Sequence, residues 1–412
     1  MPLQPHETAF TRTPAPPRPV PVIADAASAL AIADTLASDF AEAAVERDRE
    51  RRLPFAEIER FTASGLWAIS VPTEYGGPGL DSATVAQVIA RISAADGSLG
   101  QIPQNHFYAL EVLRNGGTED QKRALYGRVL AGERFGNALA EIGSRDHTRR
   151  TWLVRDPAGW IVEGRKYYCT GSLYAHRIPT LVNAEEAGRA VAYLVFIPRD
   201  APGVTLVDDW DGFGQRVTGS GSVLFERVAV EPDWVVPFQA SLERPTAIGP
   251  FAQILHAGID LGIGQGAFAA TLPFVRDRAR PWIDSGVTRA SEDPLTLHAL
   301  GDVQVRLAAA DALLARAGRF VDAAQAAPDA ERVAAASVAV AEARAASHRA
   351  GLLAANKLLE LGGTSATDRA EALDRYWRNV RTHTLHDPVR WKYHWIGAYH
   401  LDGRHPPRHG AL

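Results

Sequence analysis

The hydrophobic pattern of this chain changes its period twice. Apolar residues recur at helical spacing over residues 25–134, alternate in short runs bounded by Gly and Pro over residues 135–240, and return to long alanine-rich helical stripes over residues 241–412. The prolines of residues 1–24 predict an extended or disordered arm. The sequence therefore predicts an α+β protein in which a helical domain, a mostly antiparallel β domain and a helical bundle follow one another.

Composition and charge exclude several classes of protein. The net charge of −4 gives no electrostatic reason for binding nucleic acid or an anionic membrane. The single cysteine, Cys169, excludes an intramolecular disulfide, and we expect its side chain to pack in the core. No stretch approaches the ~20 apolar residues that span a bilayer, and the N-terminus lacks the apolar segment of a secretory signal. We therefore expect a cytoplasmic protein.

Glycines interrupt the helical stripe that begins near His256. They occur in the sequence Gly258-Ile-Asp-Leu-Gly262-Ile-Gly264-Gln-Gly266, and no strand is predicted before them. A phosphate-binding glycine loop joins a strand to a helix, so this pattern indicates a close contact between helices instead. The long helices carry more apolar surface than one bundle covers, which predicts a homo-oligomer.

The segment Arg378–His394, RNVRTHTLHDPVRWKYH, gathers arginines, histidines, an aspartate and aromatic residues around Pro388. A solvated helix face has no need of so many aromatic rings, whereas rings that exclude water around a few ionisable groups suit the floor of a pocket. We interpret the segment as part of a functional site. Its histidines and His400 share no helical face, and no HExxH motif accompanies them, so we expect no metal site.

The order of the three zones and several motifs resemble the acyl-CoA dehydrogenase superfamily. The motifs are VPTEYGGPGL from Val71, VEGRKYYCTGSLYAH from Val162 and GFGQRVTGSGSVLFERVAV from Gly212. The resemblance implies the fold of that family, with an N-terminal helical domain, a middle antiparallel β domain and a C-terminal four-helix bundle.

Other motifs resemble one branch of the superfamily, the dibenzothiophene monooxygenases and the SfnB-type sulfur-acquisition oxidoreductases. These motifs are RNVRTHTLHDPVRWK, ARPW from Ala279, AADGSLG from Ala94 and DDWDGFG from Asp208. The resemblance implies a homotetrameric, two-component flavin monooxygenase that receives FMN as FMNH2 from a separate flavin reductase. The implied reaction with O2 passes through a C4a-hydroperoxyflavin and oxygenates a small organosulfur compound for sulfur acquisition.

Two alternatives stay open, an FAD-dependent acyl-CoA dehydrogenase and a flavin-binding protein without turnover. Asp387 stands where the dehydrogenases have their proton-abstracting glutamate, and a side chain shorter by one methylene counts against that reaction. Leu359 stands where they have a glutamine that helps to hold the pyrophosphate of FAD, which favours FMN. We expect Asp387 to cap the helix after Pro388 rather than to act on substrate.

By resemblance, four residues are expected to be catalytic: His386, Asn137, Thr170 and His383. An imidazole titrates near neutral pH, so His386 can move a proton beside the flavin, with His383 as its partner. The amide of Asn137 donates and accepts hydrogen bonds, which suits flavin N5 or the oxygen bound to the flavin. Thr170 stands where the dibenzothiophene monooxygenases have a serine, so the hydroxyl group is kept. The structural alternatives are a helix-capping histidine and a strand-end asparagine that satisfies backbone groups.

The resemblance also implies the residues that bind ligands. Arg280 is expected to hold the FMN phosphate, and Thr364 and Ser365 stand where the family closes on phosphate from another subunit. The residues expected to bind flavin are Asn105, Asn137, Ala138, Lys166, Thr170, Trp210, Arg280, Thr364, Ser365 and His386. Those expected to bind substrate are Gln101, Asn105 and His106. Gln101 and Asn105 replace a histidine and a tyrosine of the dibenzothiophene enzyme, which favours a compact substrate over a tricyclic sulfide.

Overall fold

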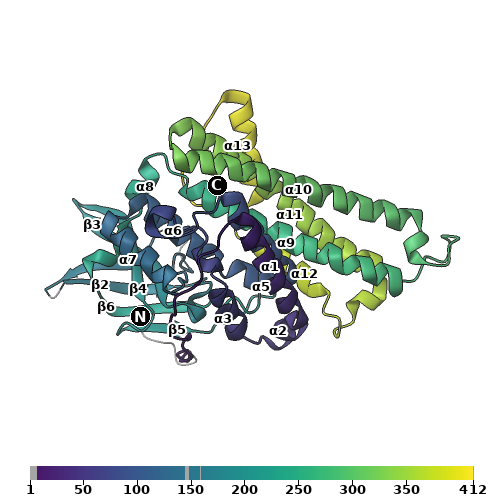
Figure 1. Cartoon of the computed structure of the whole chain (residues 1–412), viewed down its shortest axis with the longest axis horizontal. Coiled ribbons are helices and arrows are strands. Elements are labelled where there is room, and N and C mark those ends of the chain that lie inside the picture. The colour runs from purple at the N-terminus through teal and green to yellow at the C-terminus, as the bar shows by residue number, and fades with distance from the viewer. Residues whose placement is uncertain (1–6, 144–147, 158, 412) are drawn as a thin grey trace.

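Short helices, a sheet and long helices follow one another along the chain, as Figure 1 shows. The structure is a computed structural model, and it describes residues 7–143, 148–157 and 159–411. The sheet lies at one end of the molecule, and the long helices extend away from it toward the other end. The predicted fold class is therefore confirmed.

Several of the N-terminal helices begin at side-chain caps. Asp81 accepts a hydrogen bond from the backbone N–H of Thr84 (2.7 Å), and Thr118 and Gln121 form a reciprocal capping box. Such caps satisfy backbone donors that have no partner within the helix. The sequence predicts a cap at Asp81 or Ser82 and another at Thr118, and the structure has Asp81 and Thr118 in these positions. The elements of this part are α1 (Ala26–Glu42), α2 (Ala44–Glu50), α3 (Phe55–Ala63), η1 (Leu66–Ala68), η2 (Thr73–Tyr75), α4 (Ser82–Ala95), α5 (Gly97–Gln101), α6 (Gln104–Gly116) and α7 (Glu119–Leu130).

A buried arginine explains why the first predicted helix is broken. The sequence predicts one helix over Ala26–Arg51, but the chain turns at Ala43 between α1 and α2. The turn allows Arg47 to donate to the carbonyl of Phe40 and to bind the carboxylate of Asp96 at 3.0 Å. A buried guanidinium needs several such partners, so this tertiary requirement overrides the helical pattern.

The middle of the chain forms a sheet with the strand order β5-β6-β2-β1-β3-β4-β7. Pairing is antiparallel except between β1 and β3. The pattern does not predict β3, whose Pro179 lacks a backbone N–H. The strands and short helices are β1 (Trp152–Asp156), β2 (Gly159–Lys166), η3 (Ser172–Tyr174), β3 (Arg177–Glu186), β4 (Arg189–Pro198), β5 (Val204–Val207), β6 (Ser222–Val230), η4 (Pro232–Trp234) and β7 (Val235–Pro237).

Helix α9 runs through the centre of the C-terminal part and is buried along most of its length. It packs against α4, α10, α11 and α12, so apolar residues occur on all of its sides. The helices of this part are α8 (Gln239–Glu243), α9 (Ile248–Asp277), η5 (Ala290–Glu292), α10 (Pro294–Ala326), α11 (Ala330–Gly362), η6 (Gly363–Thr367), α12 (Asp374–His383) and α13 (Val389–Asp402). None of the described helices combines the length and hydrophobicity needed to cross a bilayer.

The glycines of α9 bring its backbone against α4. Three glycines of α9, spaced four residues apart, face three alanines of α4 with the same spacing. A Cβ added to any of these glycines would meet the backbone carbonyl of the facing alanine: Gly258 against Ala86, Gly262 against Ala90 and Gly266 against Ala94. Small residues on both helices therefore allow a close backbone approach. The predicted contact between helices is confirmed, and it fixes α9 relative to the N-terminal part.

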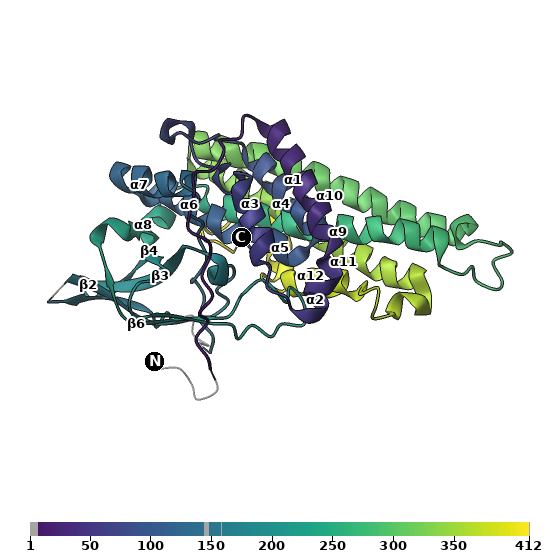
Figure 2. The same ribbon diagram turned by 60° about the horizontal axis from the view of Figure 1, so that its bottom comes forward.

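The N-terminal arm is extended from residue 7 onward and binds the β domain. The backbone N–H of Phe10 donates to the carbonyl of Leu206 (2.7 Å), and Arg199 donates to the carbonyl of Arg12 (2.6 Å). Figure 2 shows this segment running from the sheet toward the N-terminal helices. Further along the arm, the backbone N–H of Val20 donates to the carbonyl of Leu130 (3.1 Å) in the N-terminal helical part, so the arm joins the two parts.

We predict that Gly262→Ala destabilises the protein. The new methyl group would overlap the carbonyl of Ala90, and overpacking of this kind costs ~1–3 kcal/mol. The matched control is Gly301→Ala in α10, where a Cβ meets nothing within 4 Å, and it should raise the free energy of unfolding by ~0.5–1 kcal/mol. Denaturant unfolding measures both changes, and equal stability of the two variants would contradict the packing.

Candidate active site

A cavity of about 650 Å³ opens where the three parts of the chain meet. Its walls come from α5 and α6, from loops of the β domain, from α9, and from the end of α12 with the turn after it. The volume lies within the ~300–1,000 Å³ typical of ligand pockets. Seven of the site residues predicted from the sequence line this cavity: Gln101, Asn105, Asn137, Thr170, Trp210, His383 and His386.

Several residues of the lining carry a buried polar atom with no hydrogen-bond partner in the described part of the chain. These atoms are Gln101 Oε1, Gln104 Oε1, Asn137 Oδ1, Thr382 Oγ1 and Asp387 Oδ2. A buried polar atom without a partner costs ~1–3 kcal/mol. The gathering of such atoms around one cavity indicates a polar ligand that brings hydrogen-bond donors.

The side chain of Asn137 is held in place by its neighbours. Its backbone N–H donates to Ser172 Oγ (3.0 Å), and the Ser172 hydroxyl donates to the Asn137 carbonyl (2.8 Å). Its Nδ2 donates to the carbonyl of Tyr168 (3.1 Å), which leaves Oδ1 free. The fixed amide can therefore accept a hydrogen bond from a ligand without reorientation.

Hydroxyl groups and aromatic rings form the wall on the β-domain side. Thr170 Oγ1 lies 2.7 Å from Ser220 Oγ. Trp210, which was expected here, packs edge to face against Tyr168, which was not expected, with ring centroids 6.1 Å apart. Cys169 is buried, and burial raises the pKa of its thiol, so it packs in the core as predicted. This wall offers hydrogen bonds at one end and apolar faces at the other.

His383 and His386 lie beside a third histidine, His256 of α9, which the sequence analysis did not assign to a site. The rings of His256 and His386 have centroids 4.3 Å apart, and His256 Nδ1 lies 3.0 Å from His383 Nε2. His383 Nδ1 in turn donates to Asp260 Oδ1 at 2.5 Å. The spacing of His256 and Asp260, four residues apart on one helix, was the available signal. Within the described ranges, no group of His, Cys, Asp and Glu is arranged to hold a metal ion.

Asp387 does not cap α13, and that prediction is wrong. Pro388 occupies the N-cap position, and no side chain caps the helix. The Asp387 carboxylate instead lies buried, 3.5 Å from His386 Nδ1 and 4.0 Å from Lys392 Nζ. Burial would raise the pKa of Asp387, but the hydrogen bond and charge of His386 hold it below its usual range. The cavity therefore contains an ionised carboxylate beside His386.

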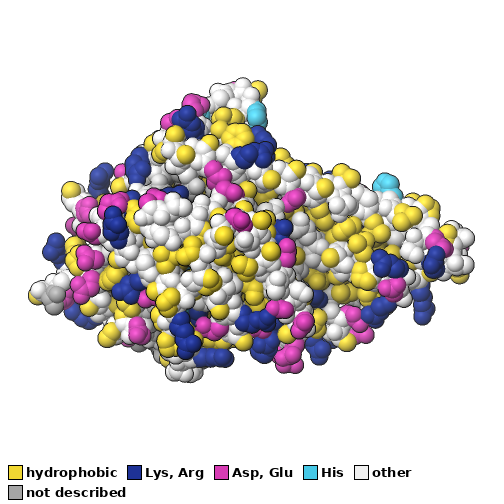
Figure 3. Space-filling model, viewed as in Figure 1, with side chains coloured by type: hydrophobic (Ala, Val, Ile, Leu, Met, Phe, Trp, Pro, Cys, Tyr) yellow, Lys and Arg dark blue, Asp and Glu magenta, His cyan; other side chains and the backbone are white. Residues whose placement is uncertain are grey.

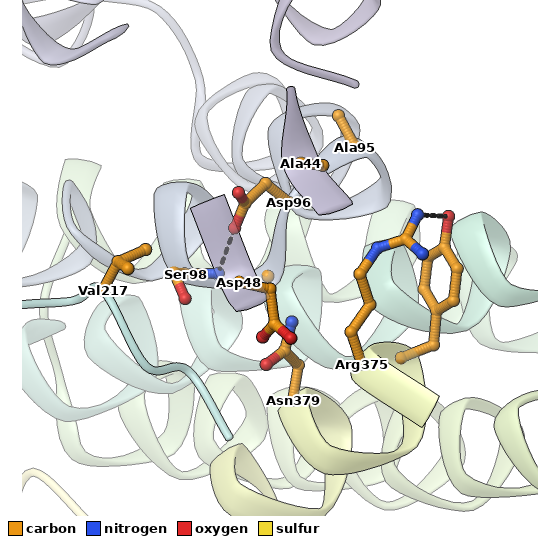
Figure 4. Close-up of a pocket in the computed structure, with 10 residues that line it drawn as sticks. Ala44, Asp48, Ala95, Asp96, Ser98, Val217, Arg375 and Asn379 are labelled. Carbon is orange, nitrogen blue, oxygen red and sulfur yellow. Dashed lines mark hydrogen bonds between the residues drawn. The ribbon is translucent and has the colours of Figure 1, made fainter. Parts of the chain in front are cut away.

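A second, small cavity lies beside α12, and Asp48 and Asn379 form part of its wall (Figure 4). This cavity measures about 10 Å³, room for about one water molecule, so it is no substrate site. Arg378 donates to both carboxylate oxygens of Asp48. Asn379 Oδ1 accepts from the backbone N–H of Gln215 (2.7 Å). These bonds join α12 to α2 and to the β domain.

Ala138 and Lys166 lie behind the cavity wall. Ala138 is fully buried, and its backbone N–H donates to a carbonyl of β3 (3.0 Å). Lys166 is also buried, and its ammonium donates to Glu141 Oε1 (2.6 Å) and to the Leu139 carbonyl (3.3 Å). Burial lowers the pKa of Lys166 to about 8, and Glu141 opposes the shift. Both residues thus hold in place the segment that contains Leu139 and Ala140, and these two residues line the cavity.

His106 is not brought to the cavity. Its Nδ1 accepts from the backbone N–H of Phe135 (3.0 Å), and its Nε2 lies 2.9 Å from the carbonyl of Trp67. Burial lowers the pKa of His106 to about 3. The neutral ring joins α6 to two backbone segments, so it is not available as a proton donor to substrate.

The predicted phosphate ligands lie at the far end of the long helices: Arg280, Thr364 and Ser365. His256 lines the cavity near the start of α9, and about 20 residues, or ~30 Å of helix, separate it from the end of α9. An ion pair between Arg278 and Glu371 (2.6 Å) joins the segments that carry the three residues. They cannot reach the cavity of their own chain.

The chain matches two protein-family models. Residues 27–133 match the N-terminal domain of acyl-CoA dehydrogenase, and residues 254–391 match its C-terminal domain. The dibenzothiophene monooxygenase of Rhodococcus erythropolis is 35% identical over 395 residues, which cover 92% of this chain and 94% of the relative.

Two solved structures are similar over nearly the whole chain. FMN-bound TdsC from Paenibacillus sp. A11-2 has a TM-score of 0.88 and 30% identity, and the match covers 93% of this chain and 100% of that one. The methanesulfinate monooxygenase MsuC from Pseudomonas fluorescens has a TM-score of 0.85 and 31% identity, with 93% and 99% covered.

The chain therefore belongs to the acyl-CoA dehydrogenase family, in its branch of flavin-dependent monooxygenases. The family and the enzyme class predicted from the sequence are confirmed.

We predict that Arg378→Ala loosens α12. The variant leaves Asp48 without its buried partner, and breaking such a pair costs ~3–5 kcal/mol when both groups are fully buried, so we expect about 2 kcal/mol at this partly exposed site. The control is Arg306→Ala, which breaks an exposed pair on α10 and should cost under ~0.5 kcal/mol. Unfolding in denaturant compares the two, and similar losses would contradict the role of Arg378.

Proposed function

We propose that the protein is an FMNH2-dependent monooxygenase that adds one oxygen atom to a compact organosulfur compound. One observation supports this above the others: imidazoles, a fixed amide and unpaired polar atoms meet in one large cavity. The chain around that cavity is similar over most of its length to dibenzothiophene monooxygenase.

The residues of the cavity fit FMN. The isoalloxazine ring carries N–H and carbonyl groups, and the ribityl chain carries hydroxyls, which match the unpaired atoms of the lining. Asn137 and Thr170 would bind the ring edge, and Trp210 would cover part of its face. The similar protein TdsC binds FMN. When bound, reduced FMN supplies the two electrons with which O2 is activated.

His386 and Asp387 can supply a proton to the reaction. One atom of O2 passes to the substrate, and the other leaves as water, which requires proton delivery. The side chain of His386 is 48% exposed, and the ionised carboxylate of Asp387 lies 3.5 Å from its Nδ1.

The substrate side of the cavity suits a small polar molecule. Gln101 and Asn105 line it and present amide groups. Such groups bind the oxygens of a sulfinate or sulfone better than the face of a tricyclic sulfide. The similar protein MsuC is a methanesulfinate monooxygenase. We therefore propose a compact organosulfur substrate and a role in sulfur acquisition.

The proposed working form is a homotetramer in the cytoplasm, supplied by a separate flavin reductase. Hydrophobic side chains gather along the long helices on the face shown in Figure 3. Large apolar residues are exposed on and before α10: Trp282, Ile283, Leu295, Leu297 and Val305. A patch of this kind marks an interface. A second copy packed there could bring Arg280, Thr364 and Ser365 to the phosphate of FMN in this cavity.

We predict that the protein, supplied with FMNH2 by any flavin reductase, consumes O2 and oxygenates at least one small sulfide, sulfone or sulfinate. Mass spectrometry of the products identifies the substrate. The variant His386→Ala should consume O2 but form at least about tenfold less product per O2, because the proton donor is gone. Wild-type coupling in this variant would remove His386 from that role.

The same experiment separates the two alternatives. An acyl-CoA dehydrogenase would retain FAD and be reduced by an acyl-CoA. A binding protein without turnover would bind FMN and release peroxide with no oxygenated product. Either result would contradict the proposed function if none of the sulfides, sulfones and sulfinates tested gives an oxygenated product.

We predict that Asn137→Ala weakens FMN binding about tenfold, because the fixed acceptor of the cavity is lost. The control is Asn115→Ala, whose side-chain amide donates to Glu111 and which is not among the described residues that line the cavity. Titration of FMN fluorescence measures both affinities. Equal affinities of the two variants would exclude contact between Asn137 and the flavin.

A further inference from the structure

A buried chain of hydrogen bonds ends in the cavity, and the proposed proton delivery does not use it. Asp260 Oδ1 accepts from His383 Nδ1 (2.5 Å), and His383 Nε2 lies 3.0 Å from His256 Nδ1. The other carboxylate oxygen of Asp260 binds Arg344, which also donates to the His256 carbonyl (2.9 Å). All four side chains are almost completely buried.

The order of these bonds determines which ring nitrogens carry protons. A carboxylate only accepts, so His383 carries its proton on Nδ1 and offers a lone pair on Nε2. His256 must then donate from Nδ1, which leaves its Nε2 without a proton. His256 lines the cavity, and its Nε2 has no hydrogen-bond partner among the described residues. The chain of bonds therefore leaves one unprotonated nitrogen at the cavity.

The charge states support this arrangement. Burial lowers the pKa of His256 and of His383 well below the usual range, and the charges of His386 and Arg344 add to the shift. Neither buried imidazole takes a second proton near neutral pH. Burial raises the pKa of Asp260 to about 6, and Arg344 opposes the shift. The ion pair with Arg344 favours the carboxylate form of Asp260.

We propose that His256 presents a fixed hydrogen-bond acceptor to the flavin and thereby favours FMNH2 over oxidised FMN. The inference rests on the proposed function, in which FMN occupies the cavity. The reduced isoalloxazine has an N–H at N5, where the oxidised ring has a lone pair. An acceptor that cannot become a donor binds the N–H and repels the lone pair. Asp260 and His383 act through His256 as positioning residues.

The first test compares the affinities of the two forms of FMN under anaerobic conditions. In His256→Asn, the amide can take the place of Nδ1 and keep the bond to His383, while Nε2 is removed. Wild-type protein should bind FMNH2 at least about tenfold more tightly than FMN, and this ratio should fall to about one in the variant. The control is His348→Asn on α11, which does not line the cavity and should keep the wild-type ratio.

The second test reverses the protons along the chain. Arg344 offers only donors, so in Asp260→Asn the amide oxygen should turn to Arg344 and the NH2 group to His383. His383 then carries its proton on Nε2, His256 must accept at Nδ1, and its Nε2 becomes a donor. Nitrogen-15 NMR of histidine-labelled protein reads these tautomers without any flavin, and His256→Asn identifies the signals of His256.

Two results would overturn the inference: a wild-type affinity ratio in His256→Asn, or a proton on His256 Nε2 in the wild-type protein. If Asp260→Asn does not fold, the His256→Asn ratio decides. Failure of the inference also differs from failure of the proposed function. If the protein binds FMN and FMNH2 equally well but still forms oxygenated product, only the inference is rejected. If it prefers FMNH2 but forms no product, only the monooxygenase activity is rejected.

Discussion

The close contact between α4 and α9 is the constraint on which the site depends. Glycines on α9 meet alanine carbonyls on α4, so the two backbones approach as nearly as sterics allow. The first part of α9 is thereby held beside α5 and α6, and it carries His256 and Asp260. A larger residue at any of these glycines would move one wall of the cavity relative to the other.

The cavity has one rigid side and one adaptable side. On the rigid side, the ion pair of Asp260 with Arg344 and the bonds through His383 determine the protonation of His256. On the other side, the amides of Gln101 and Asn105 can donate or accept. This division suits a site that keeps one cofactor in a fixed orientation while related proteins differ in substrate, as the names of MsuC and dibenzothiophene monooxygenase indicate.

Periodicity and motifs predicted the fold, and resemblance suggested where the polar lining would come from. Asn137, Thr170 and His386 line the cavity, as their motifs led us to expect. Long-range contacts decide the positions of the residues for which the prediction was wrong. His106 was expected at the substrate, but backbone groups of distant segments occupy both of its nitrogens. Asp387 was expected to cap α13, but its carboxylate lies at the cavity beside His386.

The sequence by itself determined the order of helical and β zones and the close helix contact at the glycines, which follow from local spacing. Its motifs indicated the enzyme class through their resemblance to a known family. Only the tertiary structure decided that His256 belongs to the site, that Asp260 and Arg344 stand behind it, and that Arg280, Thr364 and Ser365 lie too far away to act on their own chain. The physical reason is that the roles of these residues depend on distances between segments far apart in the chain. Those distances are set by packing, which no local pattern records.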